Sequence, residues 1–359
     1  MTNGWEKIAL LERGRHENSV RKKSRLLQQL FWECTLRCNL QCRHCGSDCQ
    51  LNEKRDDMPL NDFVRVLDEI KDKMDSCQIL VITTGGEPLM RKDLVDCGRA
   101  IKERGFYWGM VTNGMLLTDT KLRELIDAGL DAISVSVDGM KENHNWMRWN
   151  GQSFDKAVSA VKLIANSSIN LSYDVITCVN KRNIDELHLL RELLWNIGVK
   201  RWRLITVFPS GRATYESELQ LDGKQLHTLM DFIAKTRKQG KIKASYGCEG
   251  FLGPYEYEVR DYQYSCQAGI NVASILYDGS ISGCLSIRSK YNQGNIYKDS
   301  FVDVWNNRFQ KYRDRSWMKT GVCKNCEAWR WCEGNGMHLR DNEGKLLLCN
   351  YHKMFKTSN

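Results

Sequence analysis

Proline and long apolar runs are scarce in this chain of 359 residues. Only 4 residues are proline, against 27 glycines, which excludes a collagen-like or proline-rich disordered polypeptide. No stretch approaches roughly 18 consecutive apolar residues, so the sequence predicts no transmembrane helix. The apolar run from Ile8 to Leu11 is interrupted by Glu12 and Arg13, which excludes the core of a secretory signal. We therefore expect a cytoplasmic protein.

The charge balance is basic but ordinary for a globular chain. Lys and Arg number 53 and Asp and Glu number 44, which gives a formal net charge of +9. Residues 1–30 hold seven basic and three acidic side chains, a pattern that also occurs in arms binding nucleic acid or anionic lipid. No aromatic residues interleave with these charges, so we interpret the segment as a solvated, partly helical lead-in and do not expect nucleic acid as a partner.

Cysteine is abundant and unevenly distributed. The chain has 15 cysteines, an odd number, and a reducing cytosol does not sustain a disulfide framework. Five of them fall within residues 34–49 and four within residues 323–349. Buried thiols that act as small apolar residues would be scattered along the chain. The two clusters instead indicate ligands of a soft metal.

Between the two cysteine clusters, strand-like and helix-like segments alternate. Short β-branched runs occupy residues 28–33, 79–83, 107–112, 132–137, 171–179 and 203–208. Amphipathic helical patterns occupy residues 61–74, 92–104, 118–128, 153–164, 183–195 and 222–238. This alternation predicts an α/β fold with parallel strands, a partial (β/α)6 barrel over residues 31–240. In such folds the chemistry gathers at the carboxyl ends of the strands.

The pattern of apolar and polar residues changes after residue 240. Helical periodicity fades, and Asp278-Gly279 separates two short apolar segments, as in a β-hairpin. We expect three parts: a basic extension over residues 1–30, the barrel, and a small cysteine-rich, metal-stapled domain over residues 241–359.

The loop after the first predicted strand holds three closely spaced cysteines, Cys38, Cys42 and Cys45. A [4Fe–4S] cluster has four irons and is normally held by four cysteines. Three ligands would leave one iron open to another molecule. The alternative is a zinc site, but zinc hooks usually lie about 15–20 residues apart, whereas the next Cys-x2-Cys here is Cys323 and Cys326.

This Cys-x3-Cys-x2-Cys motif resembles the signature of the radical S-adenosylmethionine (radical SAM) superfamily. The resemblance implies that the open iron chelates S-adenosylmethionine, whose carbon–sulfur bond is then broken to give methionine and a 5′-deoxyadenosyl radical. Cys34 and Cys49 flank the motif, and we interpret them as ordinary small residues. His44 stands where the family more often has an aromatic hydrocarbon ring.

Other strand ends also match the family. Gly85, Gly86 and Glu87 follow the second strand and resemble the loop that contacts the methionine amino group. Glu87 would accept the ammonium or brace that loop. Ser136, at the end of the fourth strand, occupies the place of a contact to the ribose or carboxylate of S-adenosylmethionine. Arg148 would grip the carboxylate, with a surface ion pair as the alternative.

The C-terminal cysteines resemble the SPASM extension, which carries auxiliary iron–sulfur clusters in enzymes that modify peptides. The resemblance rests on a Gly-x4-Cys element followed by Cys-x2-Cys-x5-Cys. It implies a complete ligand set for a distal auxiliary cluster, formed by Cys323, Cys326, Cys332 and Cys349.

The proximal auxiliary cluster is less complete. Cys266 and Cys284 match two of its ligands, but the cysteine expected four positions after Cys332 is Gly336. Three alternatives stay open. Another residue completes the ligand set, and Cys248 is the nearest candidate; or one iron has no protein ligand; or the cluster is lost.

The resemblance implies a radical SAM enzyme that abstracts hydrogen from a peptide or protein side chain, leading to oxidation, crosslinking or maturation. A flavodoxin or ferredoxin would supply electrons. Alternatives are a small or porphyrin-like substrate, or a non-enzymatic electron carrier. Leu285 stands where sulfatase-maturing relatives place an acidic residue, which argues against formylglycine formation. The chain is also similar to a group found beside small lipoproteins.

Overall fold

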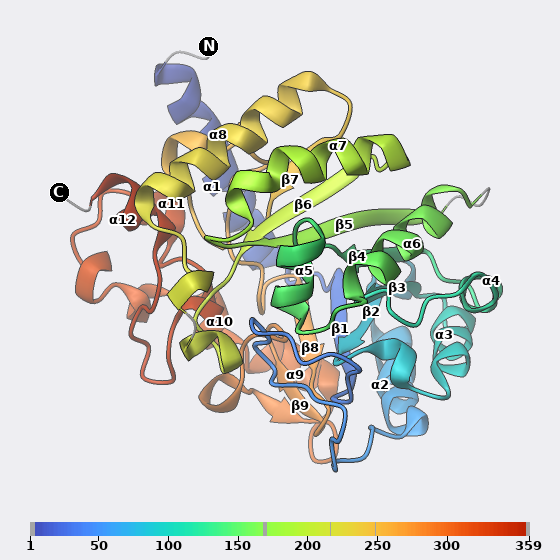
Figure 1. Ribbon diagram of the computed structural model, residues 1–359. Helices are drawn as coiled ribbons and strands as arrows, with labels where there is room; N and C mark the ends of the chain where they lie inside the picture. Colours follow the sequence, from blue (N-terminus) through green and yellow to red (C-terminus); the bar gives the residue numbers. More distant parts are fainter. Residues whose placement is uncertain (1–3, 168–170, 216, 248, 357–359) are drawn as a thin grey trace.

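The computed structural model describes residues 4–167, 171–215, 217–247 and 249–356 (Figure 1). Its strands are β1 (Gln29–Thr35), β2 (Leu80–Gly85), β3 (Tyr107–Thr112), β4 (Ala132–Ser136), β5 (Ser172–Val179), β6 (Arg201–Thr206), β7 (Lys243–Tyr246), β8 (Val272–Ile275), β9 (Ser280–Ser282) and β10 (Gly294–Asn295). Its longer helices are α1 (Gly4–Ser24), α2 (Leu60–Lys73), α3 (Leu94–Glu103), α4 (Asp119–Asp127), α5 (Lys141–Arg148), α6 (Ser153–Ala165), α7 (Leu187–Ile197) and α8 (Gly223–Gln239). Shorter helices follow at α9 (Phe301–Asn307), α10 (Gln310–Arg313), α11 (Trp329–Cys332) and α12 (Asn350–Phe355).

The strands form one sheet in the order β10-β9-β8-β1-β2-β3-β4-β5-β6-β7. Strands β1 to β6 pair in parallel with their neighbours in sequence, and helices α2, α3, α4, α6 and α7 connect them on the outer side (Figure 1). The predicted α/β fold with alternating parallel strands is confirmed. The structure adds α5, which the sequence patterns did not predict, and a seventh parallel strand, β7, beside β6.

The sheet continues into the predicted cysteine-rich part of the chain. Strand β8 pairs in parallel with β1, on the side opposite to β2. Strands β8 and β9 form an antiparallel pair around Asp278-Gly279, which confirms the expected hairpin. The boundary placed at residue 240 stays a prediction, and the sheet crosses it.

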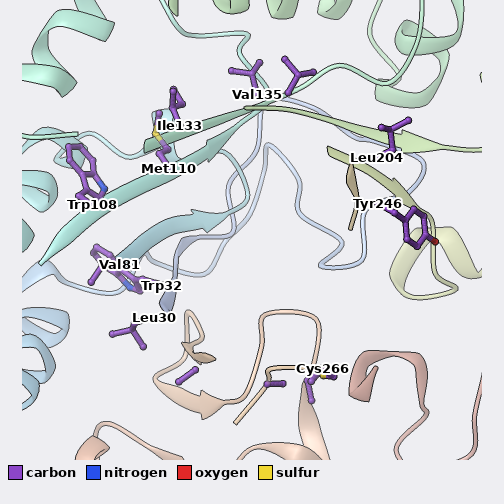
Figure 2. Packing of buried hydrophobic residues seen from close by; sticks show 14 of the residues in the cluster. Leu30, Trp32, Val81, Trp108, Met110, Ile133, Val135, Leu204, Tyr246 and Cys266 are labelled. Carbon is purple, nitrogen blue, oxygen red and sulfur yellow. The ribbon is translucent and has the colours of Figure 1, made fainter. Parts of the chain in front are cut away.

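Successive side chains of a strand point to opposite faces of the sheet, and the large apolar ones point toward the helices. Trp32, Trp108 and Trp202 lie on β1, β3 and β6 and are fully buried; the first two are labelled in Figure 2 together with Val81 from β2. The Trp32 ring stacks on Phe63 of α2 with ring centroids 4.0 Å apart. Burial of such rings dominates core energetics, so these strands are held against their helices along most of the sheet.

The basic N-terminal extension is helical, as expected, but it is docked on the C-terminal part of the chain rather than solvated. Lys7 pairs with Glu258 at 2.6 Å, and the Trp331 indole donates a hydrogen bond to Glu12 at 2.9 Å. Lys22 pairs with Glu333 at 2.5 Å. Within the described ranges, no helix combines the length and the apolar character needed to cross a bilayer.

We predict that Gly98→Ala lowers the free energy of unfolding by about 1–3 kcal/mol, the usual cost of overpacking a core. A Cβ at Gly98, in α3, would lie 2.1 Å from the buried Trp108 ring. Gly151→Ala is the control, because a Cβ there meets nothing within 4 Å. Urea unfolding of the apoproteins, followed by tryptophan fluorescence, measures both changes; equal midpoints for the two variants would contradict this packing.

Candidate functional site

The carboxyl end of β1 leads into the cysteine loop, residues 36–58, which the neighbouring strand end holds in place. The Gly86 and Glu87 amides donate to the Thr35 and Arg37 carbonyls at 2.8 and 2.9 Å. Gly85 has a φ of +120°, and a Cβ there would lie 2.3 Å from the Thr35 oxygen. Glycine is therefore required at this close approach of two backbones.

The three predicted cluster ligands lie together in this loop. Cys38 and Cys42 are buried and Cys45 is half-buried. The side-chain amide of Asn113, beyond β3, points to the Cys38 sulfur at 3.9 Å. The Arg148 guanidinium lies 3.7 Å from the Cys42 sulfur. Donors directed at sulfur stabilise thiolates, so the surroundings suit iron-bound cysteines.

In the absence of metal the three thiols differ in acidity. Burial raises the pKa of Cys38 to about 12 and also raises the pKa of Cys42, although Arg148 opposes the latter shift. A hydrogen bond from the Cys49 thiol outweighs burial and lowers the pKa of Cys45. Because iron binds the thiolate, cluster assembly must release protons from Cys38 and Cys42. Cys49, expected to be an ordinary small residue, thus contacts a candidate ligand.

Arg148, at the end of α5, forms a buried ion pair and not the surface pair considered as an alternative. Its Nε lies 2.6 Å from Asp138 Oδ2, and the Asp138 side chain is completely buried. Burial disfavours the charged guanidinium, but the Asp138 carboxylate, together with the neighbouring Cys42 and Cys178 sulfurs, raises the pKa of Arg148. The Asp138 carboxylate also accepts from the Cys178 amide at 2.8 Å. The arginine is therefore held, charged, beside Cys42.

The other predicted S-adenosylmethionine contacts lie at adjacent strand ends. The Glu87 carboxylate is buried and accepts hydrogen bonds from the Thr112 hydroxyl and the backbone amide of Asn113, both at 2.7 Å. These bonds favour the bracing role for Glu87. Ser136 ends β4 and shares a face of the sheet with Ser134, opposite the buried Ile133 and Val135, because alternate residues point to the same side.

A cavity of about 550 Å³ lies between the cysteine loop and the C-terminal part of the chain. Cys45 and Gly85 line one wall, and residues 285–288 and 337–338 line another. An ion pair joins the walls: the half-buried Arg288 binds the fully buried Glu33 carboxylate at 2.5 Å and the Ser47 hydroxyl at 2.8 Å. Cavities of this size take small molecules or a short segment of chain.

The loop after β6 closes the cysteine loop from the other side. The Arg212 guanidinium donates to the Cys42 carbonyl at 2.7 Å, and its amide donates to the Cys45 carbonyl at 3.1 Å. A Cβ at Gly211 would lie 2.4 Å from that same Cys45 oxygen. Backbone atoms of the predicted cluster ligands are thus fixed by a strand end far away in sequence.

The four cysteines predicted for the distal auxiliary cluster also come together. Burial raises the pKa of Cys332, and the nearby Cys349, Cys323 and Cys326 thiols raise it further. The Arg340 guanidinium lies 3.4 Å from the Cys323 sulfur, and the amide of His352 points to the Cys349 sulfur at 3.4 Å.

The predicted proximal pair is close as well. Burial, and then the neighbouring Cys266 thiol, raise the pKa of Cys284 to about 11. Cys248, considered as a further ligand, lies outside the described residues. Gly336 begins a short 3-10 turn, Met337–Leu339, that lines the cavity. Burial lowers the pKa of His338, in this turn, to about 4, so its imidazole is neutral.

The residues present fit iron–sulfur clusters better than single metal ions. Zinc requires about four ligands within roughly 2.3 Å of one point. Across the part of the chain that the structure describes, no three His, Cys, Asp or Glu side chains converge closely enough to hold one ion. Clustered thiols with guanidinium and amide donors at their sulfurs suit the larger, anionic cubane.

Several residues of the site were not found from the sequence. Glu33 and Arg288 belong to no local motif, and only the folded sheet brings them to the cavity. Asp138 follows β4 in the same strand-end position as the predicted Ser136, so its place in the fold was a usable signal. His338 carried no pattern of its own.

Comparison with known proteins agrees with this geometry. The family model of the radical SAM superfamily matches residues 32–194, and that of the SPASM iron-sulfur cluster-binding domain matches residues 266–327. AdoMet-dependent heme synthase of Methanosarcina barkeri is 25% identical over 325 residues, covering 85% of this chain and 90% of that protein. PqqA peptide cyclase of Rhizobium meliloti is 25% identical over 309 residues, covering 82% and 78%.

The fold has solved counterparts too. The structure of native anSMEcpe with bound AdoMet and Cp18Cys peptide superposes with a TM-score of 0.69 at 20% identity, covering 92% of this chain and 94% of that one. The cysteine loop, the parallel strand ends and the two family matches lead to one conclusion: this chain belongs to the radical SAM superfamily and is an enzyme with a SPASM domain, whose cofactors are S-adenosylmethionine, a [4Fe-4S] cluster and auxiliary iron–sulfur clusters.

Proposed function

We propose that this enzyme abstracts hydrogen from a peptide or protein side chain, with Cys38, Cys42 and Cys45 as the ligands of its S-adenosylmethionine-binding cluster. When bound, the cluster and S-adenosylmethionine supply a 5′-deoxyadenosyl radical. The observation that carries the proposal is the single cavity shared by Cys45, Gly85 and the C-terminal part of the chain.

The strand ends around the cluster position the cofactor. Gly85 and Gly86 would let the backbone approach the cofactor, while Glu87 braces their loop through Thr112 and Asn113. Ser136 would offer a hydroxyl from the end of β4. Arg148 is held charged, so it stabilises negative charge at the Cys42 thiolate and on a neighbouring carboxylate.

We assign the distal auxiliary cluster to Cys323, Cys326, Cys332 and Cys349, and two ligands of the proximal one to Cys266 and Cys284. The mutual proximity of the thiols within each set supports the assignment. With little regular structure around them, these clusters contribute folding free energy as well as redox capacity.

The lining of the cavity favours a peptide. Both arginines that line it are already engaged: Arg288 binds Glu33, and Arg340 donates to the Gly344 carbonyl at 2.7 Å and to other carbonyls. The rim also carries Asp341 and Glu343. A ligand rich in carboxylates would meet no uncommitted guanidinium here, whereas peptide groups suit the serine, asparagine and histidine side chains in the wall.

A porphyrin-like substrate is the second candidate. It is favoured by the similarity to AdoMet-dependent heme synthase, which extends over 85% of this chain. Binding its propionates would require Arg288 or Arg340 to exchange a buried partner for the ligand, and separating Arg288 from Glu33 would leave an uncompensated buried charge.

The electron donor and the compartment follow from the redox chemistry. We infer that a flavodoxin or ferredoxin reduces the cluster and that the enzyme works in the cytoplasm. The 14 described cysteines are free thiols, a state that a reducing compartment maintains.

The reduced, reconstituted enzyme should form 5′-deoxyadenosine from S-adenosylmethionine, and Cys42→Ala should abolish this product, because an iron loses its thiolate. Cys77→Ala is the matched control, since Cys77 is exposed and lies outside the site. Anaerobic assays with liquid chromatography measure the product. A cluster-loaded enzyme that forms none would refute radical SAM cleavage by this chain.

Asp138→Asn should lower the free energy of unfolding by about 3–5 kcal/mol, because it leaves the Arg148 charge buried without its partner. Asp155→Asn breaks the exposed pair with Lys141 and should cost at most about 1 kcal/mol. Urea unfolding of the apoproteins gives both values. A small, equal loss in the two variants would show that the Arg148 pair is not a buried one.

The substrate class can be tested directly. With reductant and S-adenosylmethionine, at least one member of a library of short synthetic peptides should lose hydrogen, whereas Fe-coproporphyrin III should be recovered unchanged, because the cavity arginines are already paired. Mass spectrometry of both compounds reports the outcome. Decarboxylated porphyrin together with unmodified peptide would establish the second candidate instead.

A further inference from the structure

The proximal auxiliary site has fewer thiols than a cubane requires. Among the described residues, Cys266 and Cys284 are the two thiols assigned to it, whereas a [4Fe–4S] cluster has four irons, each needing a ligand. At position 336, where the resemblance implies a third cysteine, the chain has glycine. The structure shows what stands in that space.

The backbone at Gly336 does not demand glycine. Its φ of −68° and ψ of 137° are accessible to any residue. The space beside it is nevertheless taken, because a Cβ there would lie 2.7 Å from Cε1 and 2.9 Å from Nδ1 of His338. The imidazole of His338 thus occupies the place that a side chain at position 336 would fill.

This imidazole is fixed but lacks a partner for its ring nitrogen. Nε2 of His338 is buried and makes no hydrogen bond within the described residues. The ring is oriented by an edge-to-face contact with Phe208, with centroids 4.9 Å apart. A buried polar atom without a partner is costly, so a nitrogen held in this way indicates a ligand that completes it.

Segments that adjoin Cys266 and Cys284 lie near His338. The Tyr264 hydroxyl, two residues before Cys266, would lie 2.9 Å from the same Cβ at position 336. Residues 285–288, directly after Cys284, line the cavity together with His338. The residues next to both cysteines thus come near the turn that carries His338.

We propose that His338 is a ligand of the proximal auxiliary iron–sulfur cluster, together with Cys266 and Cys284, and takes the position that a cysteine at 336 would have. The inference rests on the proposed Cys266 and Cys284 pair. Imidazole replaces thiolate in Rieske clusters, where it raises the reduction potential. Because imidazole is neutral, it makes the cluster one charge less negative and easier to reduce than an all-thiolate cluster.

The test uses the full-length chain with Cys38, Cys42 and Cys45 changed to Ala, so that only auxiliary clusters remain. We expect about eight irons per chain for two cubanes, and about four after His338→Ala. His188→Ala, an exposed histidine on α7, is the matched control and should keep about eight. Pulsed electron paramagnetic resonance of the reduced protein, with ¹⁵N-histidine labelling, should show nitrogen coupled to the cluster.

A second variant distinguishes a lost ligand from a lost fold. Gly336→Cys with His338→Ala places a thiol in the same space, so it should restore about eight irons, lose the nitrogen coupling and lower the reduction potential. The role of His338 would be overturned if His338→Ala keeps its full iron content and the labelled protein shows no nitrogen coupling. If Cys266→Ala loses iron in the same experiment, the proposed cysteine pair still stands. Full iron content in Cys266→Ala and Cys284→Ala as well would overturn the proposed pair.

Discussion

Strand β1 is hydrogen-bonded in parallel on both sides, to β2 and to β8, and the rest of the site depends on this double pairing. The strand fixes the point where the cysteine loop leaves the sheet. Its neighbours on one side contribute the glycine loop and the other barrel strand ends. On the opposite side β8 continues the sheet into the C-terminal part of the chain, from which Arg288 reaches Glu33 of β1.

At this edge of the sheet, two arginines form ion pairs with buried carboxylates. Arg148 with Asp138, and Arg288 with Glu33, each place a guanidinium near the cysteine loop while a carboxylate compensates it. Such pairs add little net stability, because desolvation offsets the attraction. Their use here is positional: they hold positive charge beside the cysteine loop, at the Cys42 sulfur and at Ser47.

Much of the fold could be predicted from the sequence, because most barrel strands and helices are long enough for the regular spacing of their apolar residues to be recognised. Helix α5 was missed because it has only eight residues and begins directly after a turn, too short for periodicity to be seen. Strand β7 has four residues, and its pairing with β6 is decided by tertiary contacts. Short elements of this kind are specified by what they pack against.

The site divides in the same way. Cys38, Cys42 and Cys45 lie within one loop, so their spacing alone indicated their chemistry. Glu33 and Arg288 come from distant parts of the chain and meet only in the folded state. His338 could not be found from the sequence, because its significance lies in the space next to Gly336 and not in any spacing of residues.

The pairing of β1 with β8 also bears on how the protein is made. During translation β1 leaves the ribosome long before β8, and α1 must likewise wait for Glu258 and Glu333. Contacts between segments so far apart in sequence form slowly. The cysteine loop beside β1 therefore gains its contact with Arg288 only after all the intervening strands and helices have been made.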